Sequence, residues 1–115
     1  MERPDFHQCI TMLRSPDPMT YEDGYQWMQG YLSDYIDELI SLMKSESVPD
    51  IRAKFVELIG DSQLQAAIPV LEEELKSPHS EVRQWAYSSL QYFEDHIANQ
   101  IAERFRLTHP HEEFL

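Results

Sequence analysis

Apolar residues recur along the chain at intervals of three and four positions, the spacing that places them on one face of an α-helix. Proline, glycine and serine interrupt these stretches where helices are expected to end or begin. No segment alternates apolar and polar residues for long, so no strand is expected. The pattern predicts an all-α chain with helices over residues 4–13, 20–32, 33–43, 49–60, 63–76, 80–93 and 96–107.

Local signals suggest where some of these helices begin and end. Thr20 is a plausible N-terminal cap for the second helix, and Gly60 is a residue type that ends helices well. Pro69 falls inside the fifth stretch, and proline removes a helical hydrogen bond there. The fifth helix is therefore expected either to kink at Pro69 or to start late, near Ile68.

A short signal of an apolar residue, a basic residue and a serine occurs three times, at Leu13-Arg14-Ser15, Met43-Lys44-Ser45 and Leu75-Lys76-Ser77. The copies lie 30 and then 32 residues apart, and each ends one predicted helix before another begins. A repeat of this length is a supersecondary unit that cannot bury its apolar face alone, so the units must stack. The signal predicts three stacked helical pairs, which offer extended binding surfaces more often than enzyme pockets.

The second and third units match each other closely. Their apolar positions correspond at an offset of 32 residues in the first helix of each pair and of 31 residues in the second helix. One residue of difference at the turn is tolerated by a loop. Chance similarity between two ordinary amphipathic helices is the alternative. The matching residues are Ile36, Leu39 and Met43 with Ile68, Leu71 and Leu75, and Ile51, Arg52 and Ile59 with Val82, Arg83 and Leu90.

Longer motifs lie in the stretch from Val48 to Phe93. They are Pro49-Asp50-Ile51-Arg52-Ala53, Glu57-Leu58-Ile59-Gly60-Asp61, Ala67-Ile68-Pro69-Val70-Leu71 and Ser80-Glu81-Val82-Arg83-Gln84-Trp85-Ala86. This stretch resembles the HEAT-repeat family; residues 36–47 resemble it fairly and the first 35 residues only loosely. The resemblance implies a short right-handed α-α superhelix of about three HEAT-like hairpins plus a C-terminal helix. It also implies a protein-binding role, because most members are adaptors.

The first unit departs from the family pattern. No arginine in it stands where Arg52 and Arg83 stand in the later units, and Gly24 and Gly30 interrupt its second predicted helix. This unit is therefore expected to be degenerate or to act as a cap.

Length and composition fit one small domain over residues 1–115, with repeats at 4–32, 34–60 and 63–93, a helix at 96–107 and a tail at 108–115. A hydrophobic content of 42% supplies a single modest core. No apolar run reaches the roughly 18 residues that span a bilayer, and the first five residues lack the layout of a secretory signal. The single cysteine, Cys9, suits a reducing compartment. A cytoplasmic protein is the expectation.

Charge separates the possible partners. The chain has 21 Asp and Glu against 9 Lys and Arg, a formal net charge of -12. Such a field repels phosphate backbones and anionic membrane surfaces, and it accelerates association with a basic protein. Solubility explains part of the acidic excess. The acidic clusters are Glu22-Asp23, Asp34 with Asp37-Glu38, Glu72-Glu73-Glu74 and Glu94-Asp95.

The helix predicted over residues 80–93 carries two stripes. Its apolar arc, which includes Val82 and Leu90, is expected to face the core. The second stripe combines two large aromatic residues with a carboxylate and a hydroxyl, and tryptophan and tyrosine are favoured at interfaces. Packing of these aromatics against the neighbouring helix is the alternative. The candidate binding residues of this half are Glu81, Trp85, Ser88, Tyr92 and the nearby Asp95.

A second group of aromatics lies in the first unit. Tyr21 and Tyr25 keep the spacing of core residues, whereas Trp27 and Tyr31 fall on another face near acidic residues. Aromatic rings beside carboxylates suit the capture of Arg or Lys. Packing of Trp27 against the following helix is the alternative. The candidate binding residues of this half are Glu22, Asp23, Trp27, Tyr31 and Asp34.

Catalytic and metal-binding signals are weak. His7 and Cys9 lie two residues apart on a helix and point away from each other, so Cys9 is interpreted as a small buried residue. The run His109-Pro110-His111-Glu112-Glu113 lies in a polar tail without supporting ligands. The run Glu72-Glu73-Glu74 fans around a helix and forms no acid/base pair. No enzyme activity, cofactor or metal is expected.

These observations favour a non-catalytic protein-binding module that neutralises a basic toxin such as a nuclease, either as a monomer or in a 1:1 complex. Acidic bacterial immunity proteins and antitoxins fit this profile, because a nuclease domain has to be basic to hold RNA or DNA. A general HEAT-type adaptor, scaffold or assembly factor is the alternative. The family resemblance adds a minor third hypothesis, a chaperone-like or lyase-like role on a chromoprotein.

Overall fold

Residues 2–115, which a computed structural model describes, form seven α-helices, one 3₁₀ helix and no strand. The prediction of an all-α fold is therefore confirmed. The elements are α1 (Phe6–Leu13), α2 (Pro18–Met28), η1 (Gln29–Tyr31), α3 (Ile36–Ser45), α4 (Pro49–Asp61), α5 (Ala67–Glu74), α6 (Ser80–Tyr92) and α7 (His96–Thr108).

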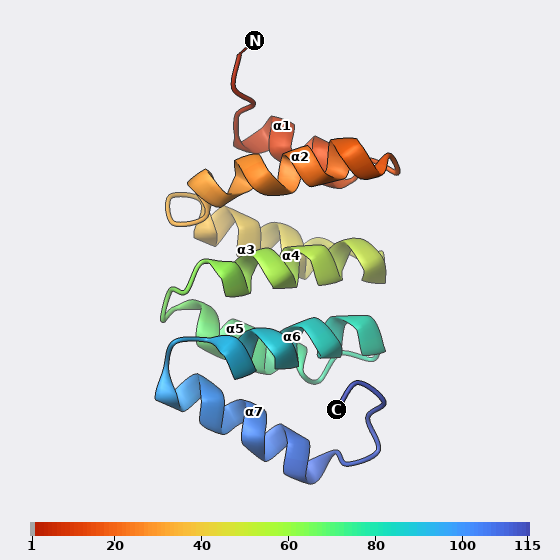
Figure 1. Cartoon of the computed structure of the whole chain (residues 1–115), viewed down its shortest axis with the longest axis vertical. Helices are drawn as coiled ribbons and strands as arrows, with labels where there is room; N and C mark the ends of the chain where they lie inside the picture. The colour runs from red at the N-terminus through yellow and green to blue at the C-terminus, as the bar shows by residue number, and fades with distance from the viewer. Residues whose placement is uncertain (1) are drawn as a thin grey trace.

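The helices form successive antiparallel pairs that stack along the long axis of the molecule (Figure 1). One layer of the stack contains α1, α3 and α5, and the other contains α2, α4 and α6, while α7 closes the C-terminal end. The turns within pairs lie along one edge, which we call the turn edge, at the right of Figure 1. The molecule measures 48 × 26 × 22 Å, so the stack is elongated.

The apolar core runs through the stack between the two layers. The apolar residue of each repeated signal is buried in it: Leu13, Met43 and Leu75 all lie at or next to the end of the first helix of a pair. The basic residue that follows is exposed in every copy. The repeated signal therefore marks the point where a buried helix ends and the chain turns at the surface.

Two glycines that the sequence suggested as helix breakers lie inside helices. A Cβ atom added to Gly24 in α2 would come within 2.7 Å of the Met12 Cβ in α1, and one added to Gly60 in α4 would come within 2.5 Å of the Ser89 Cβ in α6. These glycines let neighbouring helices approach closely. Gly24 therefore does not interrupt α2, whereas Gly30 falls in the 3₁₀ turn that follows it.

The prediction that Gly60 ends the fourth helix is wrong, because α4 continues to Asp61. The left-handed position belongs to Gln63, whose φ angle is 54°. The side chain of Gln63 holds this conformation: its Nε2 donates to the Gly60 carbonyl at 3.4 Å, and its Oε1 accepts from the Glu94 N–H at 2.8 Å. Side-chain hydrogen bonds here take the place of the glycine that this conformation favours.

Three helices begin at positions that local polar contacts explain. Asp17, not Thr20, caps α2, because its carboxylate accepts from the Thr20 N–H at 3.0 Å and Pro18 opens the helix. α3 starts at Ile36 rather than Ser33, after Tyr35 has stacked on Phe6 with ring centroids 4.4 Å apart. α5 starts at Ala67, so Pro69 lies in its first turn and no kink is needed.

Candidate protein-binding face

Arginine–carboxylate pairs line the turn edge. The guanidinium of Arg52 donates from Nε and Nη2 to Glu74 at 2.8 and 2.9 Å, and from Nη1 to the Lys44 carbonyl at 3.1 Å. Arg83 repeats this arrangement with Glu112, at 2.8 and 3.3 Å, and with the Ser77 carbonyl at 2.9 Å. The hydrogen bond with Glu74 raises the pKa of Arg52. Both arginines are thereby tied to the scaffold.

The first helical pair solves the same problem with a different arginine. It has no arginine at the position of Arg52, but Arg14 of the first repeated signal pairs with the buried Glu46 at the end of α3. Burial opposes the charged form of Glu46, yet the Val48 N–H and Arg14 hold the pKa of this carboxyl below its ordinary value. The first unit is degenerate in sequence while it keeps the arginine–carboxylate contact.

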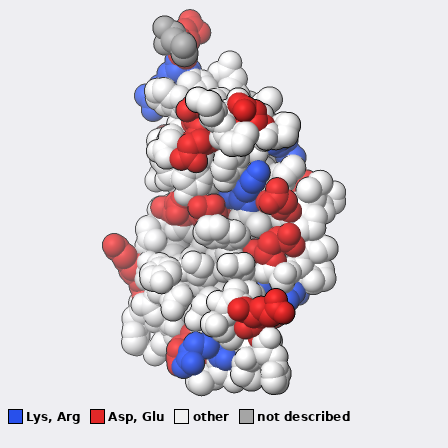
Figure 2. Space-filling model, turned by 45° about the vertical axis from the view of Figure 1, so that its right-hand side comes forward, with Lys and Arg blue, Asp and Glu red and all other residues white. Residues whose placement is uncertain are grey.

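The exposed surface of α2, α4 and α6, which we call the α2–α4–α6 face, is acidic. Its three basic residues, Arg52, Lys54 and Arg83, all take part in ion pairs. Figure 2, which brings the turn edge forward, shows carboxylates in separate patches along the stack and fewer basic groups. The carboxylates of these helices are Glu22, Asp23, Asp50, Glu57, Asp61 and Glu81.

Between α2 and α4, polar side chains join the two helices. The Tyr25 hydroxyl contacts the Glu57 carboxylate at 3.1 Å and also Asp61, and Gln29 donates from Nε2 to Asp61 at 3.3 Å. Among residues 2–115 no basic side chain forms an ion pair with Glu57 or Asp61. Burial raises the pKa of Glu57, the negative charges of Asp61 and Glu22 add to the shift, and the hydrogen bond from Tyr25 opposes it only in part.

A cleft of about 160 Å³ continues this cluster between α4 and α6. The close approach of Gly60 to Ser89 brings the two helices together there. Trp85 is 39% exposed and Tyr92 is 74% exposed, so both aromatics face solvent rather than the core. The cleft is lined by Glu57, Gly60 and Asp61 from α4 and by Trp85, Ser88 and Tyr92 from α6.

The structure brings only part of the candidate residues together. Trp85, Ser88 and Tyr92 line one cleft, and Glu81 lies one turn earlier on α6. Asp95 serves as the cap of α7: its carboxylate accepts from the Ile97 and Ala98 N–H groups at 2.8 and 3.2 Å, and from Gln65 at 2.5 Å. Asp95 therefore has a structural task beside any role in binding.

The candidates of the first unit have a different environment. Glu22 and Asp23 are exposed on α2, and Asp34 is exposed in the turn before α3. Trp27 and Tyr31 share one cation from the chain itself, because the Arg3 Cζ lies 5.6 Å from the centroid of each ring. The Tyr31 hydroxyl also donates to the Pro4 carbonyl at 2.7 Å. These two aromatics hold the N-terminal segment against α2 and η1.

Tyr25, Gln29, Glu57 and Asp61 were not among the candidates. A signal for them was present, since Tyr25 and Glu57 are 32 residues apart, as are Gln29 and Asp61. This is the repeat offset, and equivalent positions of stacked units lie side by side. The same argument at an offset of 31 relates Glu57 to Ser88 and Asp61 to Tyr92.

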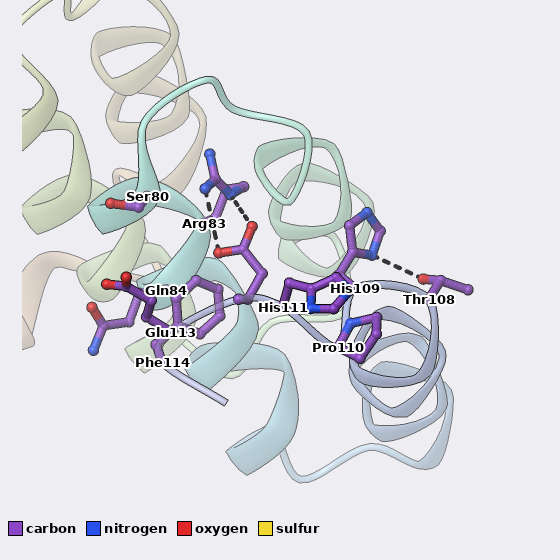
Figure 3. A pocket seen from close by; sticks show the side chains of 10 residues that line it. Ser80, Arg83, Gln84, Thr108, His109, Pro110, His111, Glu113 and Phe114 are labelled. Atoms are coloured by element: carbon purple, nitrogen blue, oxygen red, sulfur yellow. Dashed lines mark hydrogen bonds and ion pairs between the residues drawn. The ribbon is translucent and has the colours of Figure 1, made fainter.

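A larger cavity of about 670 Å³ lies under the C-terminal tail (Figure 3). Its polar groups are already engaged, because Arg83 pairs with Glu112 and the Thr108 hydroxyl lies 2.9 Å from the His109 Nδ1. Phe114 stacks on Phe105 with ring centroids 6.2 Å apart, so the tail also covers apolar surface. We interpret this region as a clasp that closes the stack.

Other chemistry is sparse in the part of the chain that the structure describes. Cys9 is buried, and burial raises the pKa of its thiol. His7 contacts Glu38 at 2.8 Å rather than Cys9. Residues 2–115 contain no group of three or more His, Cys, Asp or Glu side chains placed to hold a metal ion. No helix among them has the length and apolar character needed to cross a membrane.

Comparison with known proteins agrees with the geometry of the stack. A family model described as HEAT repeats matches residues 10–110, a range that starts within α1 and so includes the degenerate first unit. No protein of curated function and no solved structure matches the chain. The family model covers far more of the chain than residues 48–93, where the motifs are clearest. The chain belongs to the HEAT-repeat family.

Proposed function

We propose that this protein is a non-catalytic module that binds a basic protein through its α2–α4–α6 face and thereby inhibits it. HEAT repeats generally serve as protein-binding scaffolds, which supports the binding role. The proposed target is a basic toxin, such as a nuclease, held in a 1:1 complex. Occupation of the toxin's nucleic-acid surface by an acidic protein would block access of its substrate.

The observation that carries this proposal is the uncompensated charge of Glu57 and Asp61. Elsewhere on the face the basic residues are all consumed by ion pairs, so the field of the face is acidic. A protein surface that binds RNA or DNA presents Lys and Arg at phosphate spacing. Such a surface is complementary to this face in charge, and complementary charge accelerates association and selects against acidic partners.

The proposed contact surface has a centre and a periphery. Its centre contains Glu57 and Asp61 with the cleft residues Trp85, Ser88 and Tyr92. Exposed aromatics beside carboxylates supply the anchors that dominate binding energy in many interfaces. The peripheral residues are Glu22, Asp23, Trp27, Tyr31, Asp34, Glu81 and Asp95.

Affinity purification from the native cell with matched baits tests the proposal. The baits are the wild type, the face variant Glu57→Gln/Asp61→Asn and the control Glu72→Gln/Glu73→Gln, which removes equal charge from exposed positions on α5. We expect a basic protein that the wild type and the control retain and the face variant loses. Purified with its partner, the protein should inhibit that partner's nuclease activity.

Two results would contradict the proposal. One is a retained partner that is neutral or acidic and equally bound by all three baits, which would favour the general adaptor role of HEAT proteins. The other is a basic partner whose nucleic-acid hydrolysis is unaffected at saturating inhibitor, which would leave binding without inhibition.

A further inference from the structure

We propose that the cleft between α4 and α6 binds the guanidinium group of one arginine side chain. The identity of the protein that carries this arginine rests on the proposed function, whereas the recognition of the group rests on the cleft alone. The inference thus assigns a chemical class of ligand to a site of defined size.

The first argument is the comparison of half-buried and buried carboxylates. Glu46, Glu74 and Glu112 each pair with an arginine of the chain. Glu57 is partly buried as well, but its only hydrogen-bond partner among the described residues is the Tyr25 hydroxyl. That hydroxyl has one proton and faces two carboxylates, so Glu57 and Asp61 together carry more negative charge than their neighbours offset.

The second argument is size. At about 160 Å³ the cleft is smaller than the roughly 300–1,000 Å³ typical of sites for small-molecule ligands. It has room for the head of one side chain. Gly60 and Ser89 form its narrow base, where the helices approach too closely for an additional Cβ.

The third argument is the combination of groups around the cleft. Trp85 and Tyr92 provide aromatic faces, Ser88 provides a hydroxyl, and Glu57 and Asp61 provide carboxylate oxygens. A planar guanidinium stacks on aromatic rings and donates to several oxygens at once, whereas a lysine ammonium is a compact, strongly hydrated point charge. The arrangement therefore favours arginine over lysine.

The chain contains a related arrangement elsewhere. Arg3 lies against the rings of Trp27 and Tyr31, with its Cζ 5.6 Å from each centroid. At that place the aromatics are present without a carboxylate pair in contact with the guanidinium. The α4–α6 cleft adds the carboxylates, so its attraction for a guanidinium from solution should be stronger.

The test is a titration of the full-length protein with N-acetyl-arginine amide, followed by the NMR signals of the Trp85 indole N–H and the Tyr92 ring. We expect saturable shifts with a dissociation constant on the order of millimolar, as befits a single side chain. N-acetyl-lysine amide should bind several-fold more weakly. The uncharged isostere N-acetyl-citrulline amide should bind at least about tenfold more weakly.

Two variants at exposed positions probe the site without threatening the fold. Asp61→Asn and Tyr92→Ala should each weaken binding of the arginine amide by about fivefold or more, because one removes a charge and the other an aromatic face. Glu72→Gln on α5 is the matched control and should change binding less than twofold. Thermal unfolding of each variant checks that the fold is intact.

Equal binding of the arginine and citrulline amides would overturn the inference. So would equal shifts at the Trp27 and Trp85 indoles that Asp61→Asn leaves unchanged, since the cation would then associate with acidic surface in general. The proposed function is judged separately. Arginine binding without any basic protein partner would refute that function and keep the cleft, and a basic partner whose affinity ignores Asp61→Asn and Tyr92→Ala would do the reverse.

Discussion

Arg83 pairs with Glu112 of the C-terminal tail in the same way that Arg52 pairs with Glu74 of the following helical pair. Both guanidiniums donate from Nε and Nη2 to one carboxylate and from Nη1 to a backbone carbonyl at the end of the preceding helix. The tail thus supplies the carboxylate that a further repeat would provide. A stack of repeats needs such a terminal cap, because its last unit has no neighbour.

Removal of this carboxylate should destabilise the protein. Glu112→Ala leaves Arg83, whose side chain is 21% exposed, without its ionic partner, and hydrogen bonds to charged groups contribute about 1.5–3 kcal/mol. We expect the free energy of unfolding in urea to fall by about that amount. The control is Glu113→Ala, an exposed neighbour, which should change stability by less than about 0.5 kcal/mol. Equal effects of the two substitutions would show that Glu112 does not clasp the tail.

Gly60 should be intolerant of a side chain, in contrast to an ordinary helical glycine. An added Cβ would collide with Ser89, so Gly60→Ala should cost about 1–3 kcal/mol although alanine favours helix. The substitution Ser89→Gly in the same chain should recover part of the loss, because it removes the atoms that collide. Gly30→Ala serves as the control, since a Cβ there meets only the flexible end of Arg3 at 3.1 Å. A stabilising effect of Gly60→Ala, measured by urea unfolding, would contradict the close approach of α4 and α6.

Glu57 should make stability depend on pH in a direction opposite to that of most carboxylates. Because its pKa is raised above the ordinary 4.5, the folded protein keeps a proton that the unfolded chain has already lost. The contribution of Glu57 is therefore most favourable below pH 4.5 and is lost as pH rises through the raised pKa. Glu57→Gln should be more stable than the wild type at pH 7, and this advantage should shrink toward pH 4. Unfolding in urea across this range tests the sign, and an advantage that grows as pH falls would refute the raised pKa.

The helices and their stacking could be predicted because the determining signals are local or periodic. Helical spacing of apolar residues places Val82 and Leu90 in the core, and the repeated signal marks buried Leu13, Met43 and Leu75 at helix ends. The role of Gly60 could not be predicted in this way. A glycine can adopt a left-handed turn or permit a close approach, and only the position of Ser89 on another helix distinguishes the two.

The candidate site was predictable only within one helix. Periodicity along α6 selected Trp85, Ser88 and Tyr92, which do line one cleft. Contacts between helices need the repeat offset, which relates Tyr25 to Glu57 as it relates Arg14 to Glu46. The contact of Arg3 with Trp27 has no such signal, since Arg3 precedes the first repeat.

The central claim is that the acidic α2–α4–α6 face captures a basic protein, and the association rate constant of the purified complex tests it most directly. The rate should be measured at about 50 mM and about 500 mM salt for the wild type, for Glu57→Gln/Asp61→Asn and for Glu72→Gln/Glu73→Gln. We predict that salt slows the wild type and the α5 control by about tenfold or more, and that the face variant associates more slowly at low salt and depends less on salt. A wild-type rate that does not change with salt, or a face variant that behaves like the α5 control, would contradict the account.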